Sequence, residues 1–178
     1  MDTIKVLDKE FKLYIPQEEI ESVIRNMANK INEDYKGKNP LFLVMLNGAF
    51  MFASQLFKEL EIDCETSFVK YSSYDGLQST CEVKELIGLN SSLEGRDIVI
   101  VEDIIDSGFT MNCLLQKLQS MKVSSVRVAA MLFKPNAFKF DYKIDYIGMN
   151  IGNEFIVGYG LDYNEHGRNY ASIYKVVE

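Results

Sequence analysis

Residues 102–110 hold side chains that could bind a phosphorylated sugar. Two adjacent acids are followed three residues later by a carboxylate, two hydroxyls and a flexible glycine: Glu102, Asp103, Asp106, Ser107, Gly108 and Thr110. An acid pair suits a sugar diol together with a metal ion. Small polar residues before a helix leave free backbone amides, which bind phosphate. The spacing therefore predicts a ribose-phosphate site.

The elements on either side would hold these residues at the edge of a sheet. Ile98–Val101 is an apolar, β-branched run typical of a buried strand. A helical pattern follows the loop, with Leu114, Leu115, Leu118 and Met121 on one face. The carboxyl ends of parallel strands are where open α/β sheets bind ligands. Acids after a strand are often solvated and Ser-Gly often only caps a helix, so the order of the parts, rather than any one part, indicates the site.

The rest of the chain alternates strands and helices. Residues 4–15 are expected to be extended, and Pro16 to occupy the first position of a helix that ends near Gly37. A second helix carries Phe52 and Leu56. This alternation predicts an α/β fold whose mostly parallel, twisted sheet has helices on both faces. The other expected strands are 41–46, 62–72, 81–88, 126–133, 144–149 and 155–159.

Composition limits the function. With 178 residues and 47% hydrophobic content, the chain is expected to form one domain over residues 1–178. The net charge is −7, which argues against a nucleic-acid partner or an anionic membrane. A polyanionic substrate would then need help from a divalent cation, so we expect Mg²⁺, which binds through one or two carboxylates and substrate phosphates.

The cysteines and the apolar runs indicate a cytoplasmic protein. Cys64, Cys81 and Cys113 are odd in number and lack the CxxC spacing, which is typical of a reducing compartment. We find no signal-peptide core near Met1, and no apolar run approaches the ~20 residues of a membrane span.

The run 98–110 resembles the phosphoribosyl diphosphate motif of type I phosphoribosyltransferases: a hydrophobic strand, two acids, two aliphatics, then Asp-Ser-Gly and Thr. The resemblance is to the 6-oxopurine branch over about residues 41–170, and it also rests on Leu46-Asn47-Gly48-Ala49, Ser73-Tyr74, Lys134 and 155–168. It implies the family's sheet with a small hood subdomain from the chain termini. It also implies Mg²⁺-dependent conversion of hypoxanthine or guanine and the sugar donor to IMP or GMP, and a homodimer or homotetramer.

The resemblance assigns the sugar donor to three groups of residues. Glu102 and Asp103 would hold the ribose hydroxyls and Mg²⁺, and Asp106 to Thr110, including Phe109, the 5′-phosphate. Leu46, Asn47 and Gly48, with a cis peptide bond, would bind pyrophosphate with Arg168. Asn47 stands where relatives usually carry Lys or Arg, so a cationic contact is lost there. Ser73 and Tyr74 would belong to a lid that excludes water.

The purine would meet residues from distant segments. By resemblance Lys134 donates to the 6-oxo group, Phe155 stacks on the ring, the Ile156 backbone meets its edge, and Asp162 approaches Mg²⁺ through water. An ammonium suits a carbonyl oxygen and disfavours the amino group of adenine. Asp106 would be the general base that accepts the proton from N7.

Plainer interpretations exist for each of these residues. Lys134, Asp162 and Arg168 could simply be solvated, and Phe155 could belong to the core. His166, the only histidine, is expected to be uninvolved.

Two other functions stay open from sequence. An RNA-binding regulator of the same fold would need a basic face, against which the net charge argues. A receiver-like signalling domain would need an acid pair after its first strand, and residues 4–15 offer none so placed. The preference among hypoxanthine, guanine and xanthine is not determined by the sequence.

Overall fold

A six-stranded sheet forms the centre of the molecule, in the order β5-β4-β3-β6-β7-β8. The computed structural model describes residues 3–72, 84–87 and 93–177. Strands β4, β3, β6, β7 and β8 pair in parallel, and β5 runs antiparallel to β4 at one edge. The predicted mostly parallel sheet is confirmed. The strand bounds are β3 Leu41–Leu46, β4 Glu65–Ser72, β5 Lys84–Ile87, β6 Asp97–Ile105, β7 Ser125–Phe133 and β8 Tyr146–Asn150.

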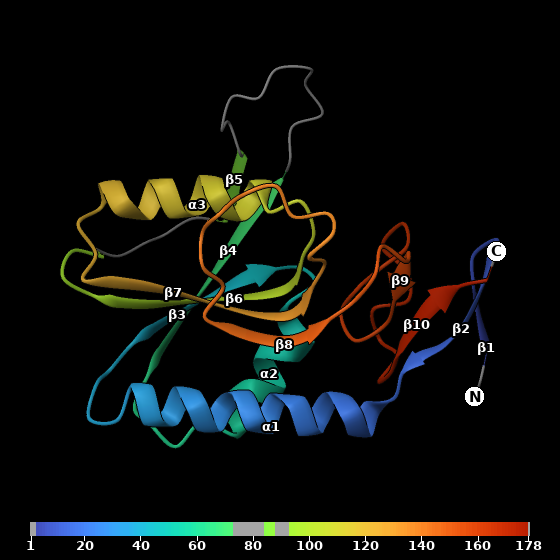
Figure 1. Cartoon of the computed structure of the whole chain (residues 1–178), viewed down its shortest axis with the longest axis horizontal. Coiled ribbons are helices and arrows are strands. Elements are labelled where there is room, and N and C mark those ends of the chain that lie inside the picture. Colours follow the sequence, from blue (N-terminus) through green and yellow to red (C-terminus); the bar gives the residue numbers. More distant parts are fainter. Residues whose placement is uncertain (1–2, 73–83, 88–92, 178) are drawn as a thin grey trace.

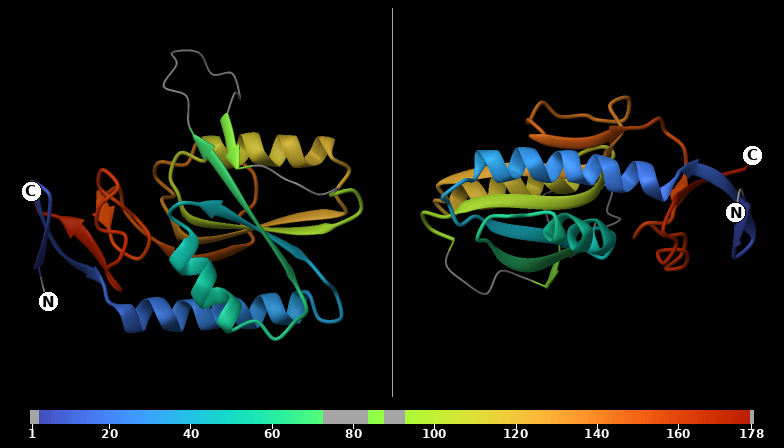
Figure 2. Two further views of the ribbon diagram at one scale, coloured as in Figure 1. Left: turned by 180° about the vertical axis from the view of Figure 1, so that it is seen from behind. Right: turned by 90° about the horizontal axis from the view of Figure 1, so that it is seen from below.

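Helices cover both faces of this sheet (Figures 1 and 2). Helix α3, Phe109–Ser120, lies on one face, while α1, Gln17–Asp34, and α2, Phe50–Lys58, lie on the other. Pro16 caps α1 in an extended conformation, so it precedes the first helical position instead of filling it. No helix among the described residues is long and apolar enough to cross a membrane. The buried helix faces are Ile20, Ile24, Met27, Ala28, Ile31, Phe52, Ala53, Leu56, Met111, Cys113, Leu114 and Leu118.

A second, smaller sheet of four strands stands beside the first, in the order β1-β2-β10-β9 (Figure 1). Its strands are antiparallel and come mainly from the two ends of the chain: β1 Thr3–Val6, β2 Lys9–Ile15, β9 Ile156–Val157 and β10 Ile173–Val176. It has a small core of its own, formed by Ile4, Val6, Phe11, Val157 and Tyr174. This is the expected hood. The sequence pattern did not predict β10.

The first strands of the chain therefore lie outside the parallel sheet. The first strand of the parallel sheet is β3, and Asn47 and Gly48 follow it instead of the acid pair that a receiver-like domain would need.

Strand β6 is longer than its apolar run. It continues from Asp97 to Ile105, so Glu102 and Asp103 are strand residues. The sequence pattern had predicted that the strand ends before them. The reason is pairing with β7, which extends through Glu102↔Ala130 and Ile105↔Phe133. Successive strand residues point to opposite sides of a sheet. The end of β6 departs from this alternation, because the carboxyl groups of Glu102 and Asp103 hydrogen-bond each other.

Candidate active site

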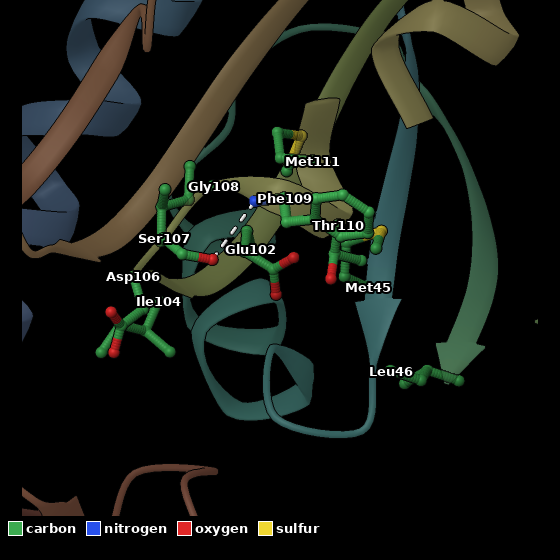
Figure 3. A pocket seen from close by; sticks show the side chains of 11 residues that line it. Met45, Leu46, Glu102, Ile104, Asp106, Ser107, Gly108, Phe109, Thr110 and Met111 are labelled. Carbon is green, nitrogen blue, oxygen red and sulfur yellow. Dashed lines mark hydrogen bonds between the residues drawn. The ribbon is translucent and has the colours of Figure 1, made fainter. Parts of the chain in front are cut away.

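A cavity of about 270 Å³ opens at the carboxyl ends of β3 and β6 (Figure 3). Seven of the residues that the sequence singled out line it: Leu46, Glu102, Asp106, Ser107, Gly108, Phe109 and Thr110. Sequence reasoning missed the apolar part of its wall, which comprises Met45, Ile104, Ile105 and Met111. These four carry no chemical signal, because strands and helix starts commonly bear such residues. The cavity lies where parallel sheets bind ligands.

The loop between β6 and α3 presents free amides to this cavity. Gly108 caps α3 with a left-handed backbone (φ +82°), which costs glycine little. The first carbonyl of the helix, that of Gly108, accepts from Asn112 N at 3.0 Å. Among the described residues, the amides of Thr110 and Met111 meet no backbone carbonyl, as is normal in a first helical turn. Such a turn is suited to an anion.

The acid pair is partly buried in the site. Burial and the neighbouring Asp103 carboxylate raise the pKa of Glu102 well above its usual range. Burial also raises the pKa of Asp103, although a hydrogen bond from Glu102 and the Ile104 amide oppose the rise. Among the described residues no lysine or arginine forms an ion pair with either acid. Two enclosed carboxylates without a cation at contact distance fit a hard divalent ion that brings its other ligands with it.

Gly48 lies directly against Asp103. A Cβ on Gly48 would fall 1.6 Å from Asp103 Oδ2, so only glycine leaves room for that carboxylate. The preceding bond, Leu46–Asn47, is a cis peptide, as the resemblance implies. A Cβ on Gly160 would fall 2.0 Å from the Gly48 carbonyl oxygen. The hood therefore touches the loop after β3, and that loop touches the acid pair.

Lys134 and Asp106 form an ion pair across the ends of β7 and β6. The Lys134 Nζ–Asp106 Oδ2 distance is 2.9 Å. The lysine is buried, with 9% exposure, so it is not the solvated loop residue that the plainer interpretation offered. The carboxylate side chain is 55% exposed and faces the site entrance. A fixed donor and a fixed acceptor thus lie side by side next to the cavity.

The hood brings its charged residues together around one guanidinium. Arg168 contacts Asp162 Oδ1 and Glu165 Oε2, each at 2.9 Å, and donates to the Gly160 carbonyl oxygen at 2.9 Å. The Arg168 hydrogen bond lowers the pKa of Glu165. Sequence reasoning missed Glu165, although its spacing of three residues from Arg168 was a usable signal. Asp162 is paired with Arg168. Among the described residues, no three His, Cys, Asp or Glu side chains lie close enough together to hold a metal ion by themselves.

Phe155 stands on the hood with 45% of its surface exposed. Its ring packs edge-on against Tyr163, with centroids 5.7 Å apart, and against Phe11 at 6.1 Å. Nearly half of the Phe155 side chain therefore remains accessible, while the neighbouring Ile156 is buried. His166 is exposed and pairs only through its backbone, with Tyr163. Ser73 and Tyr74, the predicted lid residues, lie outside the described residues.

The fold and the site define the class of protein. Residues 15–164 match the family model of the phosphoribosyl transferase domain. The chain is 38% identical over 174 residues to the hypoxanthine-guanine phosphoribosyltransferase of Streptococcus thermophilus, covering 96% of this chain and 97% of that protein. The chain belongs to the hypoxanthine-guanine phosphoribosyltransferase family.

Other relatives agree with this placement. A crystal structure of a hypoxanthine phosphoribosyltransferase from Staphylococcus aureus superposes with a TM-score of 0.89 at 36% identity, covering 93% of this chain and 91% of that one. The bifunctional protein TilS/HprT of Listeria monocytogenes is 40% identical over 167 residues, which is 92% of this chain. The chain spans only 26% of the length of that curated relative.

Proposed function

We propose that this protein transfers the phosphoribosyl group of 5-phospho-α-D-ribose 1-diphosphate to hypoxanthine or guanine, forming IMP or GMP and pyrophosphate. The observation that carries the proposal is the Lys134–Asp106 ion pair beside the phosphate-binding loop. The 6-oxo oxygen of these purines accepts a hydrogen bond and the adjacent N7–H donates one. The ammonium and the carboxylate are the complementary groups, held 2.9 Å apart.

The base and the sugar donor would meet at the entrance of the cavity. The N9 lone pair attacks C1′, the bond from C1′ to the diphosphate oxygen breaks, and the electron pair leaves with pyrophosphate. Asp106 accepts the N7 proton as positive charge develops on the purine. Lys134 holds the 6-oxo group, and Phe155 stacks on the ring next to the Ile156 backbone.

The remaining residues would hold the donor. The amides of the 106–110 loop, with the hydroxyls of Ser107 and Thr110, bind the 5′-phosphate. Glu102 and Asp103 bind the ribose hydroxyls. The 46–48 loop and the Arg168 guanidinium bind pyrophosphate, with Asn47 contributing no charge.

Mg²⁺ is the cation we propose for this site, held by Glu102 and Asp103 and approached by Asp162 through water. When bound, it would neutralise part of the charge on the diphosphate. The enclosed acid pair fits this role, because Mg²⁺ keeps several waters and needs few protein ligands.

Turnover with four purines tests the function. The protein, Mg²⁺ and the sugar donor are mixed with hypoxanthine, guanine, xanthine or adenine, and nucleotide and pyrophosphate are measured. We expect product with hypoxanthine or guanine and little with adenine. No turnover with any 6-oxopurine would overturn the assignment. The same assay ranks hypoxanthine, guanine and xanthine. Lys134 and Asp106 would not distinguish them, because all three carry the 6-oxo group and N7.

We further propose that residues 1–178 act as one domain in the cytoplasm, and that copies associate as a homodimer or homotetramer. Phe50 at the start of α2 and Phe68 on β4 are 44% and 46% exposed, and a subunit interface would bury them. Light scattering should give two or four times the 20.4 kDa of one chain. A mass of 20.4 kDa at all concentrations would exclude this assembly.

A further inference from the structure

The segment that follows β7 lies against the back of the phosphate-binding loop. Three of its donors reach the carbonyl oxygen at the end of β6 and two carbonyl oxygens of that loop. Lys134 N donates to Ile105 O at 2.9 Å and Lys139 N to Ser107 O at 3.1 Å. Tyr142 Oη donates to Gly108 O at 3.0 Å. Residues 134–142 therefore hold the loop at successive points along one side.

These contacts determine where the loop amides point. In a trans peptide the carbonyl of one residue and the N–H of the next point in opposite directions. With the carbonyls of Ser107 and Gly108 turned toward segment 134–142, the N–H groups of Gly108 and Phe109 point away from it. Ser107 to Met111 line the cavity, whereas residues 134–142 are not among its lining residues (Figure 3).

Tyr142 and Phe138 also fill the space beside Gly108. A Cβ on Gly108 would lie 2.5 Å from Phe138 Cε2 and 2.7 Å from Tyr142 Oη. The two rings meet edge to face with centroids 5.0 Å apart, and Phe138 meets Phe133 in the same way at 5.2 Å. This packing fixes the phenol in the position from which it donates to Gly108 O. The left-handed Gly108 is thus held from the side that faces away from the ligand.

We propose that Tyr142 is a positioning residue for the phosphate site: together with the helical bond from Asn112 N, its hydroxyl holds the Gly108 carbonyl outward. The Phe109 amide, which donates to Ser107 Oγ at 3.4 Å in the free protein, then stays turned toward the cavity. This inference rests on the proposed function only for the identity of the phosphate, which would be the 5′-phosphate of the sugar donor. Burial and the charge of Glu102 raise the pKa of Tyr142. The phenol therefore remains protonated, and a donor, throughout the working pH range.

The test compares Tyr142→Phe with Tyr146→Phe. Tyr146 lies four residues further along the chain and donates to Asp34 Oδ2 at 2.6 Å, away from the cavity. Tyr146 also accepts from Arg127 Nη1 at 2.6 Å, so Tyr146→Phe removes two hydrogen bonds where Tyr142→Phe removes one, and it is the more severe control. The probe is ribose 5-phosphate, titrated calorimetrically into the free protein without purine. We expect Tyr142→Phe to weaken binding about three- to tenfold, the usual range for a single neutral hydrogen bond, and Tyr146→Phe to leave it unchanged.

Steady-state kinetics provides the second measurement. Tyr142→Phe should raise KM for the sugar donor by the same factor while KM for hypoxanthine stays the same. A merely structural role would raise both, or lower the melting temperature without changing the ribose 5-phosphate Kd. Unchanged Kd in folded Tyr142→Phe, or equal losses in the two tyrosine variants, overturns the proposal.

A further variant covers the case in which Tyr142→Phe does not fold. Phe138→Leu removes the ring that orients the phenol and should weaken ribose 5-phosphate binding in the same direction. If it binds as the unmodified protein does, the proposal is wrong. If no purine is turned over but Tyr142→Phe still weakens ribose 5-phosphate binding selectively, the proposed function fails while the positioning role stands.

Discussion

The two regions that form the site are built in opposite ways. The side at the carboxyl ends of the strands comes mainly from one stretch, residues 102–111, with Met45 and Leu46 of β3 beside it. Its acid pair is partly buried and has no ion-pair partner among the described residues. The hood side comes from residues 155–168, and its acids are exposed or half-buried around Arg168. One region holds two carboxyl groups with raised pKa values and no ion-pair partner among the described residues, whereas in the other two carboxylates share one guanidinium.

This difference predicts that the two regions affect protein stability and ligand binding differently. Burying an unpaired carboxylate costs free energy, which a bound cation or ligand can return. Surface ion pairs contribute little to stability, but they can be exchanged for ligand contacts at small cost. The region at the carboxyl ends of the strands is therefore expected to be tuned for binding at the expense of stability. Exchanging the Arg168 ion pairs of the hood for ligand contacts is expected to change the folding free energy little.

The largest effect should come from Asp106 at the carboxyl ends of the strands. Asp106→Asn removes the proton acceptor for N7 and should lower kcat by about 10²–10⁴-fold. Asp162→Asn in the hood removes a carboxylate that acts through water and should lower activity by about tenfold. Both are measured as steady-state turnover of hypoxanthine. Near-normal turnover in Asp106→Asn would remove it from the role of base, and equal losses in the two variants would contradict the contrast between the regions.

The second effect is on the choice of base. Lys134→Met keeps the length of the buried side chain but removes the donor to the 6-oxo group. The preference for hypoxanthine over adenine should fall by about a hundredfold or more, because the ammonium no longer opposes the 6-amino group. Lys139→Met, an exposed lysine of the same segment, is the control and should retain the preference. The preference is measured as the ratio of kcat/KM for hypoxanthine to that for adenine. An unchanged ratio in Lys134→Met would show that Lys134 does not determine the choice of base.

Removing the buried charge should stabilise the free protein. The raised pKa of Glu102 means that the folded state binds this proton more tightly than the unfolded state. Stability is therefore lost as the pH rises from the ordinary glutamate pKa through the raised one. Glu102→Gln should add roughly 1–3 kcal/mol at pH 8, and less at pH 5. For a chain of this length, each kcal/mol corresponds to about 2–4 °C in melting temperature.

The hood supplies the control for that experiment. Glu165 is exposed and its pKa is lowered by Arg168, so Glu165→Gln should change the melting temperature little at either pH. Glu102→Gln should also bind the sugar donor more weakly in the presence of Mg²⁺. If Glu102→Gln is less stable at pH 8 than the unmodified protein, the acid pair does not lower the free energy of unfolding and the prediction is wrong.

The smallest effect is expected at the far end of the sheet, away from both regions. A hydrogen bond from Tyr146 and the nearby Arg127 guanidinium lower the pKa of Asp34. This contribution to stability is present above the unfolded-state pKa and is lost as the pH falls through the lowered one. Asp34→Asn should cost less than about 1 kcal/mol at pH 7, since water screens exposed charges, and nothing at pH 2. Thermal unfolding at the two pH values measures it, and any loss of turnover would contradict the assignment of Asp34 to structure alone.

Much of the parallel sheet could be predicted because its signals are local. The apolar run of β3 was placed with its observed bounds, Leu41–Leu46. The order of strand, acids, loop and helix in residues 98–120 was also correct, apart from the extension of β6 to Ile105. Strand β10 escaped prediction because four residues pairing with β2 and β9 carry no periodic pattern of their own.

The site divides in the same way. The sequence by itself predicted the chemistry of the site, from the types and spacing of Glu102, Asp103 and Asp106. These carboxylates, with the hydroxyls and the glycine that follow, lie close together in the sequence and need no distant segment to bring them together. The sequence by itself did not determine that Lys134 is buried and bonded to Asp106, that Gly160 touches the Gly48 carbonyl, or that Tyr142 holds Gly108. The residues in these three contacts are 28, 112 and 34 positions apart in the sequence, respectively. Only the packing of β7, the hood and segment 134–142 against the carboxyl ends of the strands brings them within bonding distance, because close approach of distant segments depends on the whole fold and not on local spacing.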